Sequence, residues 1–295
     1  MKSKIQNPKS KICLTVAGLD PSGGAGIIAD IKTFTAFGCF ATAAVTSLTF
    51  QNTCGVFGAA HQTAETVRRQ ILPVIEDFKV AAVKTGMLPT REIIKETAQI
   101  IKENKLKNIV IDPVVRSTCG FDLIDESALC SLIEKLFPLA DVVTPNLPEA
   151  ERIARLKIET EADIKKAARI MQSFGAKNVL IKGGHSSILD LEEHHTKPNK
   201  GQKTKDKGRT ARDYLFVGEN LHIFEAKFIE TTATHGTGCT LASAIAANLA
   251  LGKNLIEAVE TAKRFVTEAI RTAPNLGKGN SPINHSILDF GFAKR

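Results

Sequence analysis

Short apolar segments alternate with segments of helical periodicity along most of this 295-residue chain, and this alternation places the fold in the α/β class. Apolar runs rich in Val and Ile predict strands at residues 12–17, 42–49, 80–84, 108–112, 142–144, 178–182, 214–217 and 222–226. Helical spacing predicts helices at residues 24–37, 64–76, 91–104, 126–137, 148–156, 161–174, 238–251 and 255–272. Strands separated by helices form βαβ units, so we expect a mostly parallel central sheet.

The chain is basic, with 39 Lys and Arg residues against 31 Asp and Glu residues and a net charge of +8. Such a charge suits either nucleic acid or an anionic substrate as a partner. Residues 1–11 carry +4, residues 194–212 carry +6, and the rest of the chain sums to −2. We therefore interpret 1–11 as a basic tail and 194–212 as an insert in a single domain spanning 12–290. The insert lacks large apolar residues and is expected to be a mobile loop, with an ordered anion-binding loop as the alternative.

Several classes of protein are disfavoured by the sequence. The apolar run at residues 12–19 is too short to cross a bilayer, and Asp20 to Gly24 follow where a signal peptide would need a cleavage site. The six Cys residues form no C-x-x-C pair, which disfavours a zinc site and is typical of a reducing compartment. With no Trp and one Tyr, the chain has few stacking platforms for single-stranded nucleic acid. We expect a cytoplasmic protein that binds neither membrane nor nucleic acid.

A glycine-rich turn at residues 16–26 joins the first predicted strand to the first predicted helix. The turn is not a dinucleotide fingerprint, because its glycines lack the G-x-G-x-x-G spacing. It is not a P-loop either, because Gly24 and Ala25 stand where Lys and Ser or Thr are required. Two interpretations remain open: a tight strand-to-helix turn, or backbone N–H groups that hold a polar or anionic ligand.

A second glycine-rich turn, at residues 234–240, leads into a helix of small residues. Gly236 and Gly238 allow successive N–H groups to converge on one point and predict an anion hole. Cys239 falls in the first helical turn, where the helix dipole is expected to stabilise a thiolate that acts as a base or nucleophile. The alternative is that Cys239 is a small packing residue.

Polar residues follow three successive predicted strands. Asp112 ends one strand, Asn146 and Glu149 follow the next, and Lys182 with two glycines ends the third. The carboxyl ends of parallel strands meet at one edge of a sheet, where ligands of open α/β proteins bind. Carboxylates suit Mg²⁺, whereas a cation with glycines suits phosphate. Together with the anion hole, these residues predict phosphoryl transfer.

These motifs resemble those of the hydroxymethylpyrimidine/phosphomethylpyrimidine kinases of thiamine biosynthesis, in the ribokinase-like superfamily. The matching segments, between residues 12 and 285, are AGLDPSGGAGIIADIKTFTAFG, TFQNTCGV, VKTGML, the DPVV segment ending in STCG, TPNLPEAE, LIKGGH, THGTGCTLASAIAA and LGKGNSPINH. The resemblance implies a ribokinase-like three-layer α/β/α sandwich and a homodimer. It also implies ATP- and Mg²⁺-dependent phosphorylation of 4-amino-5-hydroxymethyl-2-methylpyrimidine and of its monophosphate. The segment after Asp112, with Arg116 and Cys119, leaves open which side chain there touches phosphate.

The resemblance also assigns roles to individual residues of this chain. The residues implied to bind the pyrimidine are Gly18, Asp30, Gln51, Met87 and Val114. Those implied to act in catalysis are Cys239 as the base and Gly236 and Gly238 as the anion hole. Those implied to bind the nucleotide are Asn146, Lys182 and Thr237, and those implied to organise Mg²⁺ are Asp112 and Glu149.

Three alternative functions remain. The first is a pyridoxine/pyridoxal kinase, because relatives with the same Cys-type anion hole act on that ring; Gln51 and Met87 favour the aminopyrimidine. The second is a basic nucleic-acid-binding protein that uses the tail and the insert. The third is an inactive pyrimidine sensor, against which the intact anion hole argues.

Overall fold

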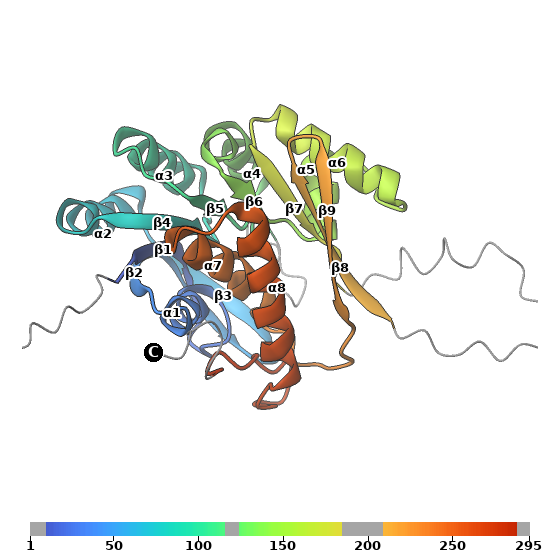
Figure 1. Cartoon of the computed structure of the whole chain (residues 1–295). Coiled ribbons are helices and arrows are strands. Elements are labelled where there is room, and N and C mark those ends of the chain that lie inside the picture. Colours follow the sequence, from blue (N-terminus) through green and yellow to red (C-terminus); the bar gives the residue numbers. More distant parts are fainter. Residues whose placement is uncertain (1–9, 116–123, 185–208, 288–295) are drawn as a thin grey trace, which may run out of the picture.

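The computed structural model describes residues 10–115, 124–184 and 209–287. The strands of these residues form a nine-stranded sheet in the order β3-β2-β1-β4-β5-β6-β7-β8-β9 (Figure 1). Their bounds are β1 Ile12–Leu19, β2 Phe40–Asn52, β3 Gly55–His61, β4 Val80–Thr85, β5 Ile109–Ile111, β6 Val142–Val143, β7 Asn178–Lys182, β8 Thr210–Val217 and β9 Asn220–Lys227. The pairs from β2 through β1 and β4 to β7 are parallel, whereas β3, β8 and β9 join antiparallel.

Helices cover both faces of the sheet (Figure 1). Their bounds are α1 Gly26–Ala36, α2 Ala64–Asp77, α3 Arg91–Glu103, α4 Glu126–Ser131, α5 Leu147–Ala154, α6 Glu161–Ser173, α7 Thr237–Ala250 and α8 Leu255–Arg271. Alternate strand residues pack on opposite sides: Cys13 and Val110 join the cluster of α1, α7 and α8, whereas Leu14 and Ile111 join the cluster of α2 to α6. The predicted three-layer α/β/α sandwich with a mostly parallel sheet is confirmed.

Capping side chains set where several helices begin. Asp125 accepts from Ala128 N at 2.7 Å at the start of α4, and Thr160 accepts from Asp163 N at 3.2 Å at the start of α6. Of the helix predicted at 126–137, only Glu126–Ser131 is α-helical, and these residues form α4. It continues as one π-helical turn (η1, Leu132–Leu136) and one 3-10 turn (η2, Phe137–Leu139), with Pro138 in the latter.

Two regions differ from the expectation. Strand β3 was not predicted, because Gly55–His61 is rich in Gly and Ala and half exposed, so it lacks an apolar alternation. The insert was expected to reach residue 212, but Thr210–Val217 forms β8, and Arg212 Nε donates to Glu225 Oε1 on β9 at 2.6 Å. Residues 1–9 of the tail, residues 194–208 of the insert, Arg116 and Cys119 lie outside the described residues.

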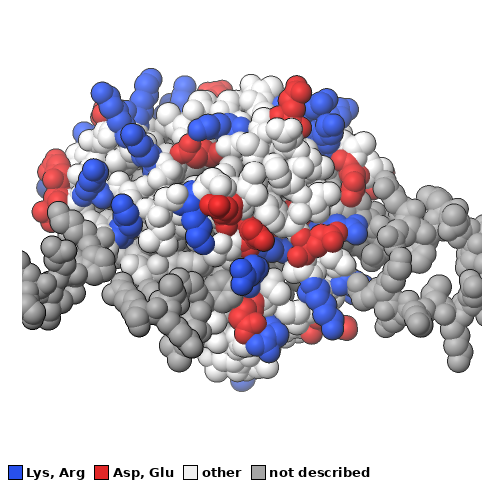
Figure 2. Space-filling view, viewed as in Figure 1, with Lys and Arg blue, Asp and Glu red and all other residues white. Residues whose placement is uncertain are grey.

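Charges of both signs are mixed over the face drawn in Figure 2, where Lys and Arg side chains alternate with Asp and Glu. This agrees with the near-neutral sum of the chain outside the tail and the insert. None of the helices in the described ranges combines the length and the apolar character that a membrane span requires.

Candidate active site

A cavity of about 420 Å³ lies at the carboxyl ends of the parallel strands and is bordered by the first turn of α7. Of the thirteen residues that the sequence assigned to the site, twelve line this cavity. They are Gly18, Gln51, Met87, Asp112, Val114, Asn146, Glu149, Lys182, Gly236, Thr237, Gly238 and Cys239. The exception is Asp30, which lies beneath the cavity wall.

The turn before α7 depends on two glycines. Gly236 caps the helix at φ +83°, a backbone conformation that favours glycine, and a Cβ there would overlap the Gly24 carbonyl oxygen. A Cβ at Gly238 would lie 3.2 Å from Lys182 Nζ. The first N–H groups of a helix have no partner within the helix, so the start of α7 offers donors beside a cation. This is the geometry of an anion hole.

Asp20 and His235 join the two glycine-rich turns, although 215 residues separate them. His235 Nε2 lies 2.7 Å from Asp20 Oδ2, which also accepts from Ala25 N at 2.8 Å, while Asp20 Oδ1 accepts from Ser22 N at 2.8 Å. Burial raises the pKa of Asp20, but hydrogen bonds from His235, Ser22 and Gln51 outweigh it and hold that pKa below its ordinary value. Sequence reasoning missed this pair because nothing local links Asp20 to His235.

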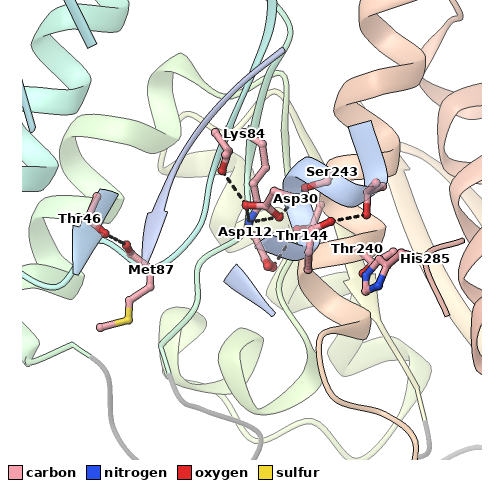
Figure 3. A network of polar contacts seen from close by, with 12 residues as sticks. Asp30, Thr46, Lys84, Met87, Asp112, Thr144, Thr240, Ser243 and His285 are labelled. Carbon is pink, nitrogen blue, oxygen red and sulfur yellow. Dashed lines mark hydrogen bonds and ion pairs between the residues drawn. The ribbon is translucent and has the colours of Figure 1, made fainter. Parts of the chain in front are cut away.

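Asp30, which the sequence assigns to the pyrimidine site, has its carboxylate buried inside the protein. Its carboxylate is fully buried and accepts from Thr15 Oγ1 at 2.6 Å, from Ser243 Oγ at 2.6 Å and from Lys84 Nζ at 2.9 Å (Figure 3). These three partners come from β1, β4 and α7 of the protein itself. The carboxylate oxygens are therefore directed into the protein, and Asp30 does not present them to a ligand in the cavity.

Lys84 is a functional candidate that sequence reasoning missed. Its side chain is fully buried, yet the residue contributes to the cavity wall. Burial lowers the pKa of the ammonium group, but Asp30, Cys239 and Asp112 outweigh it and raise the pKa above its ordinary value, so Lys84 is charged. A lysine inside a run of strand residues, in the segment VKTGML, was the available signal.

Cys239 is a free thiol on the cavity wall, and its pKa departs from the expectation. Burial, together with Asp112 and Asp30, raises the pKa of the thiol to about 11, although Lys84 and the Gly26 N–H act in the opposite direction. Burial thus outweighs the effects of Lys84 and the Gly26 N–H, and the thiol of the free protein is protonated at neutral pH.

Asp112 and Lys182 form an ion pair on the side of the cavity next to α7. Lys182 Nζ lies 2.9 Å from Asp112 Oδ1. The same oxygen accepts from Thr144 Oγ1 at 3.2 Å, and Figure 3 shows Asp112 and Thr144 together. Asp112 follows β5, Thr144 follows β6 and Lys182 ends β7, so three neighbouring strands bring the pair together. The ammonium group holds a position where it can meet a phosphate.

Glu149 and Asn146 form a capping box at the start of α5. Glu149 Oε2 accepts from Asn146 N at 2.8 Å, and its Oε1 accepts from Val115 N at 3.3 Å. Burial raises the pKa of Glu149 to about 7. The charge of Asp112 also raises this pKa, whereas the charge of Lys182 lowers it.

Within the described ranges, no cluster of three or more His, Cys, Asp or Glu side chains could hold a metal alone. Two carboxylates fit Mg²⁺, which in kinases binds one or two carboxylates together with substrate phosphates.

The end of the cavity near β1 and β2 is narrow. A Cβ at Gly18 would lie 3.2 Å from Met87 Sδ, and Thr46 Oγ1 donates to the Met87 carbonyl at 2.7 Å, which fixes the Met87 backbone (Figure 3). Gln51 and Val114 complete this end. A thioether, an aliphatic side chain and one amide form a slot suited to a flat heteroaromatic ring.

The opposite end of the cavity is apolar and lies between α8 and β9. Its lining includes Ala226, Phe228, Leu241, Val266 and Ile270. An ion pair borders it, with Lys263 Nζ 2.7 Å from Asp213 Oδ2. The lining thus combines apolar residues of β9 and α8, Lys182 beside the start of α7 and the Gly18–Met87 contact, which suits two ligands that meet at the start of α7.

Comparison with known proteins gives consistent results. The family model described as phosphomethylpyrimidine kinase matches residues 20–284. A curated relative, the hydroxymethylpyrimidine/phosphomethylpyrimidine kinase of Staphylococcus aureus strain MSSA476, is 41% identical over 278 residues, which are 94% of each chain.

Two solved structures resemble the fold over most of its length. The ADP complex of Bacillus subtilis pyridoxal kinase has a TM-score of 0.80 and 35% identity, and the match covers 94% of this chain and 98% of that one. The phosphomethylpyrimidine kinase of Clostridium difficile has a TM-score of 0.72 and 38% identity, over 88% of this chain and 100% of that one.

Proposed function

The chain belongs to the phosphomethylpyrimidine kinase family and has its ribokinase-like fold, and we propose that it uses ATP to phosphorylate 4-amino-5-hydroxymethyl-2-methylpyrimidine and then its monophosphate, giving the diphosphate for thiamine biosynthesis. The observation that carries the proposal is the convergence of twelve assigned residues, from seven separate segments of the sequence, on one cavity. The narrow end suits the pyrimidine, and the apolar end beyond Lys182 suits the nucleoside of ATP.

The proposed pyrimidine site comprises Gly18, Gln51, Met87 and Val114. The Gln51 amide donates one hydrogen bond to Asp20, which leaves one acceptor and one donor to match the ring nitrogen and amino group of an aminopyrimidine. Met87 and Val114 supply apolar contact for the ring faces. In this arrangement the hydroxymethyl group is directed towards the start of α7 and Cys239.

The proposed transfer is an in-line displacement at the γ-phosphorus. The hydroxymethyl oxygen forms a bond to phosphorus while the bond from phosphorus to the bridging oxygen breaks and its electron pair leaves with ADP. The hydroxyl proton passes to the sulfur of Cys239, which must be deprotonated beforehand. N–H groups at Gly236 and Gly238, with Lys182, stabilise the charge on the transferred group, while Asn146 and Thr237 contact the nucleotide.

We assign Asp112 and Glu149 to Mg²⁺, because two buried carboxylates beside a phosphate-binding lysine fit the oxygen preference of that ion. When bound, Mg²⁺ would neutralise negative charge on the nucleotide phosphates.

The raised pKa of Glu149 predicts a pH-dependent affinity for Mg²⁺–nucleotide. A carboxyl group with a pKa of about 7 carries a proton below that pH and is charged above it. Affinity should therefore rise about tenfold between pH 6 and pH 8, because only the charged form binds the metal well. Calorimetric titration of wild type and Glu149→Gln at each pH measures the effect. Protonation of the nucleotide itself changes the affinity of wild type and Glu149→Gln equally. If the affinity of both proteins depends on pH in the same way, the assignment of Glu149 is contradicted.

The experiment that tests the proposed function is an ADP-release assay with three acceptors: the pyrimidine alcohol, its monophosphate and pyridoxal. Efficient turnover of the first two, with a lower kcat/KM for pyridoxal, supports the proposal. The pyridoxal arm matters because the Bacillus subtilis pyridoxal kinase shares 35% identity with this chain. A higher kcat/KM for pyridoxal would reassign the substrate. Pyrimidine binding without ADP release would indicate a sensor.

We also propose that the protein is a homodimer formed through the β2–β3 hairpin. Phe57 is 71% exposed and Phe50 is 55% exposed, and Leu48 on the same hairpin is exposed as well, so the hairpin presents apolar side chains that a partner could cover. Light scattering should give twice the mass of one chain for wild type and for Phe174→Glu, a matched exposed phenylalanine at the end of α6. Phe57→Glu should give the mass of one chain, and a monomeric wild type would overturn the proposal.

A further inference from the structure

Residues 276–285, here called the C-terminal strap, connect the two ends of the candidate site. They belong to the segment LGKGNSPINH, to which the proposed reaction gives no role. The strap contacts the turn between β2 and β3 at its beginning and the anion-hole turn further along. Ser281, Ile283 and His285 are buried, so the strap is packed into the protein.

At its beginning, the strap binds Thr53 in the turn between β2 and β3. Thr53 Oγ1 accepts from Lys278 N at 3.2 Å and from Gly279 N at 3.3 Å, and the Thr53 carbonyl accepts from Asn280 N at 2.8 Å. The contact leaves no space for a side chain: a Cβ at Gly277 or Gly279 would overlap Thr53. Three hydrogen bonds and two close glycines thus fix this turn.

Further along, the strap contacts the two glycine-rich turns. His235 N donates to the Ser281 carbonyl at 3.2 Å, and a Cβ at Gly24 would lie 2.9 Å from Pro282 Cβ. His285 Nε2 lies 2.9 Å from Thr240 Oγ1 in α7 (Figure 3). The strap is therefore held at this end independently of Thr53.

Gln51 lies two residues before Thr53 and lines the narrow end of the cavity. The strand register shifts between Phe50 and Gln51, a bulge that changes the direction of the following side chains. Cys54 N donates to Asn52 Oδ1 at 2.8 Å and closes the turn after it. The direction of Gln51 thus depends on how the turn around Thr53 is held, together with its side-chain hydrogen bond to Asp20.

We propose that Thr53 is a positioning residue, which the strap uses to hold Gln51 over the pyrimidine end of the cavity. Thr53 does not line the cavity and acts only through Gln51. The inference rests on the proposed function, because that function gives Gln51 its contact with the acceptor alcohol.

Two substitutions loosen the contact. Thr53→Val removes the accepting hydroxyl while keeping the shape, and Gly279→Ala places a Cβ 2.6 Å from the Thr53 carbonyl carbon. Each should raise the KM for the pyrimidine alcohol about three- to tenfold, while kcat and the KM for ATP stay within about twofold of wild type. The matched controls are Thr53→Ser, which restores the hydroxyl, and Gly55→Ala in the same hairpin, where a Cβ meets nothing within 4 Å. Both controls should behave as wild type.

A double-mutant cycle separates positioning from general stability. If Thr53 acts through Gln51, Thr53→Val should add no further increase in KM when Gln51 is already Ala. The inference is overturned if Thr53→Val and Gly279→Ala leave the KM for the alcohol within twofold of wild type. It is also overturned if the KM for ATP rises equally, or if the effects of Thr53→Val and Gln51→Ala multiply.

Turnover of the pyrimidine alcohol by wild type tests the proposed function alone. If wild type prefers pyridoxal, the cycle is measured with pyridoxal. If it turns over neither alcohol, calorimetric affinity for each replaces KM. The inference then depends only on whether the effect of Thr53→Val disappears in the Gln51→Ala background.

Discussion

Replacing Cys239 by Ser or Ala is expected to lower kcat by about 10²- to 10⁴-fold while leaving both KM values within about threefold, which is the usual contribution of a positioned base. The thiol lies on the cavity wall at the start of α7, beside the proposed anion hole. A serine hydroxyl can donate and accept hydrogen bonds there, but it does not lose its proton at neutral pH. If the sulfur accepts the proton, Ser and Ala should be equally inactive.

The pH dependence of kcat strengthens this test. Because burial raises the pKa of Cys239 to about 11, only a small fraction of the free protein carries a thiolate at neutral pH. Below its pKa, the charged fraction of a base rises about tenfold per pH unit, so kcat of wild type should rise between pH 6 and pH 9. That rise should be absent from both variants.

The control for Cys239 is Cys130→Ser, an exposed cysteine in α4 away from the cavity, which should keep wild-type rates. Two results would reject the base assignment. One is a Ser variant that keeps more than a tenth of kcat, which would leave Cys239 a hydrogen-bonding role only. The other is a pH profile of the Ser variant that matches wild type.

Most of the fold could be predicted because its signal is local. The runs that form β1, β4, β5 and β7 are apolar on both faces, as strands buried between two helical layers must be. Strand β3 lacks that signal because Gly55–His61 packs at the edge of the sheet, half exposed and rich in small residues. The strand forms by pairing with β2, whose partner residues lie 3 to 14 positions away in the sequence. The composition of residues 55–61 alone does not indicate that pairing.

The candidate site was predictable to the extent that it follows strand ends and glycine turns. Asp112, Asn146 and Lys182 follow consecutive parallel strands, so topology alone brings them together. The buried orientation of Asp30 could not be predicted, because it depends on how α1 packs against β4 and α7. His235, which pairs with Asp20, and the strap residues that bind Thr53 lie more than 200 residues away from their partners, and no local pattern encodes such contacts.

The Lys84–Asp30 pair is expected to have the largest single effect on stability. Both side chains are fully buried and 2.9 Å apart, and two hydroxyl groups donate to the carboxylate. Removing either charge leaves the other buried without its partner, so Lys84→Met and Asp30→Asn should each lower the free energy of unfolding by about 3–5 kcal/mol. That is a large part of the about 5–15 kcal/mol that stabilises a typical domain.

Denaturant unfolding of wild type, both single variants and the double variant measures the coupling between the two charges. The double variant should be more stable than the sum of the single losses implies, by at least about 2 kcal/mol, because neither charge is then left alone. Additive losses would show that the pair contributes only through its shape. Arg68→Met, which breaks an ion pair with Glu96 at the protein surface, is the control and should cost less than about 1 kcal/mol.

The pH dependence of these losses identifies which charge is responsible. In wild type the pKa of Lys84 is raised, so the stability that its charge supplies is complete below the ordinary lysine pKa of 10.5 and is lost only at more alkaline pH. In Asp30→Asn, a buried ammonium group without its carboxylate has a lowered pKa and can lose its proton. The loss in free energy of unfolding of Asp30→Asn relative to wild type should therefore shrink as pH rises from 7 towards 10. The loss of Lys84→Met should not shrink, because that variant has no ammonium group to deprotonate. Equal pH dependence in the two variants would contradict a charged Lys84 beneath Cys239.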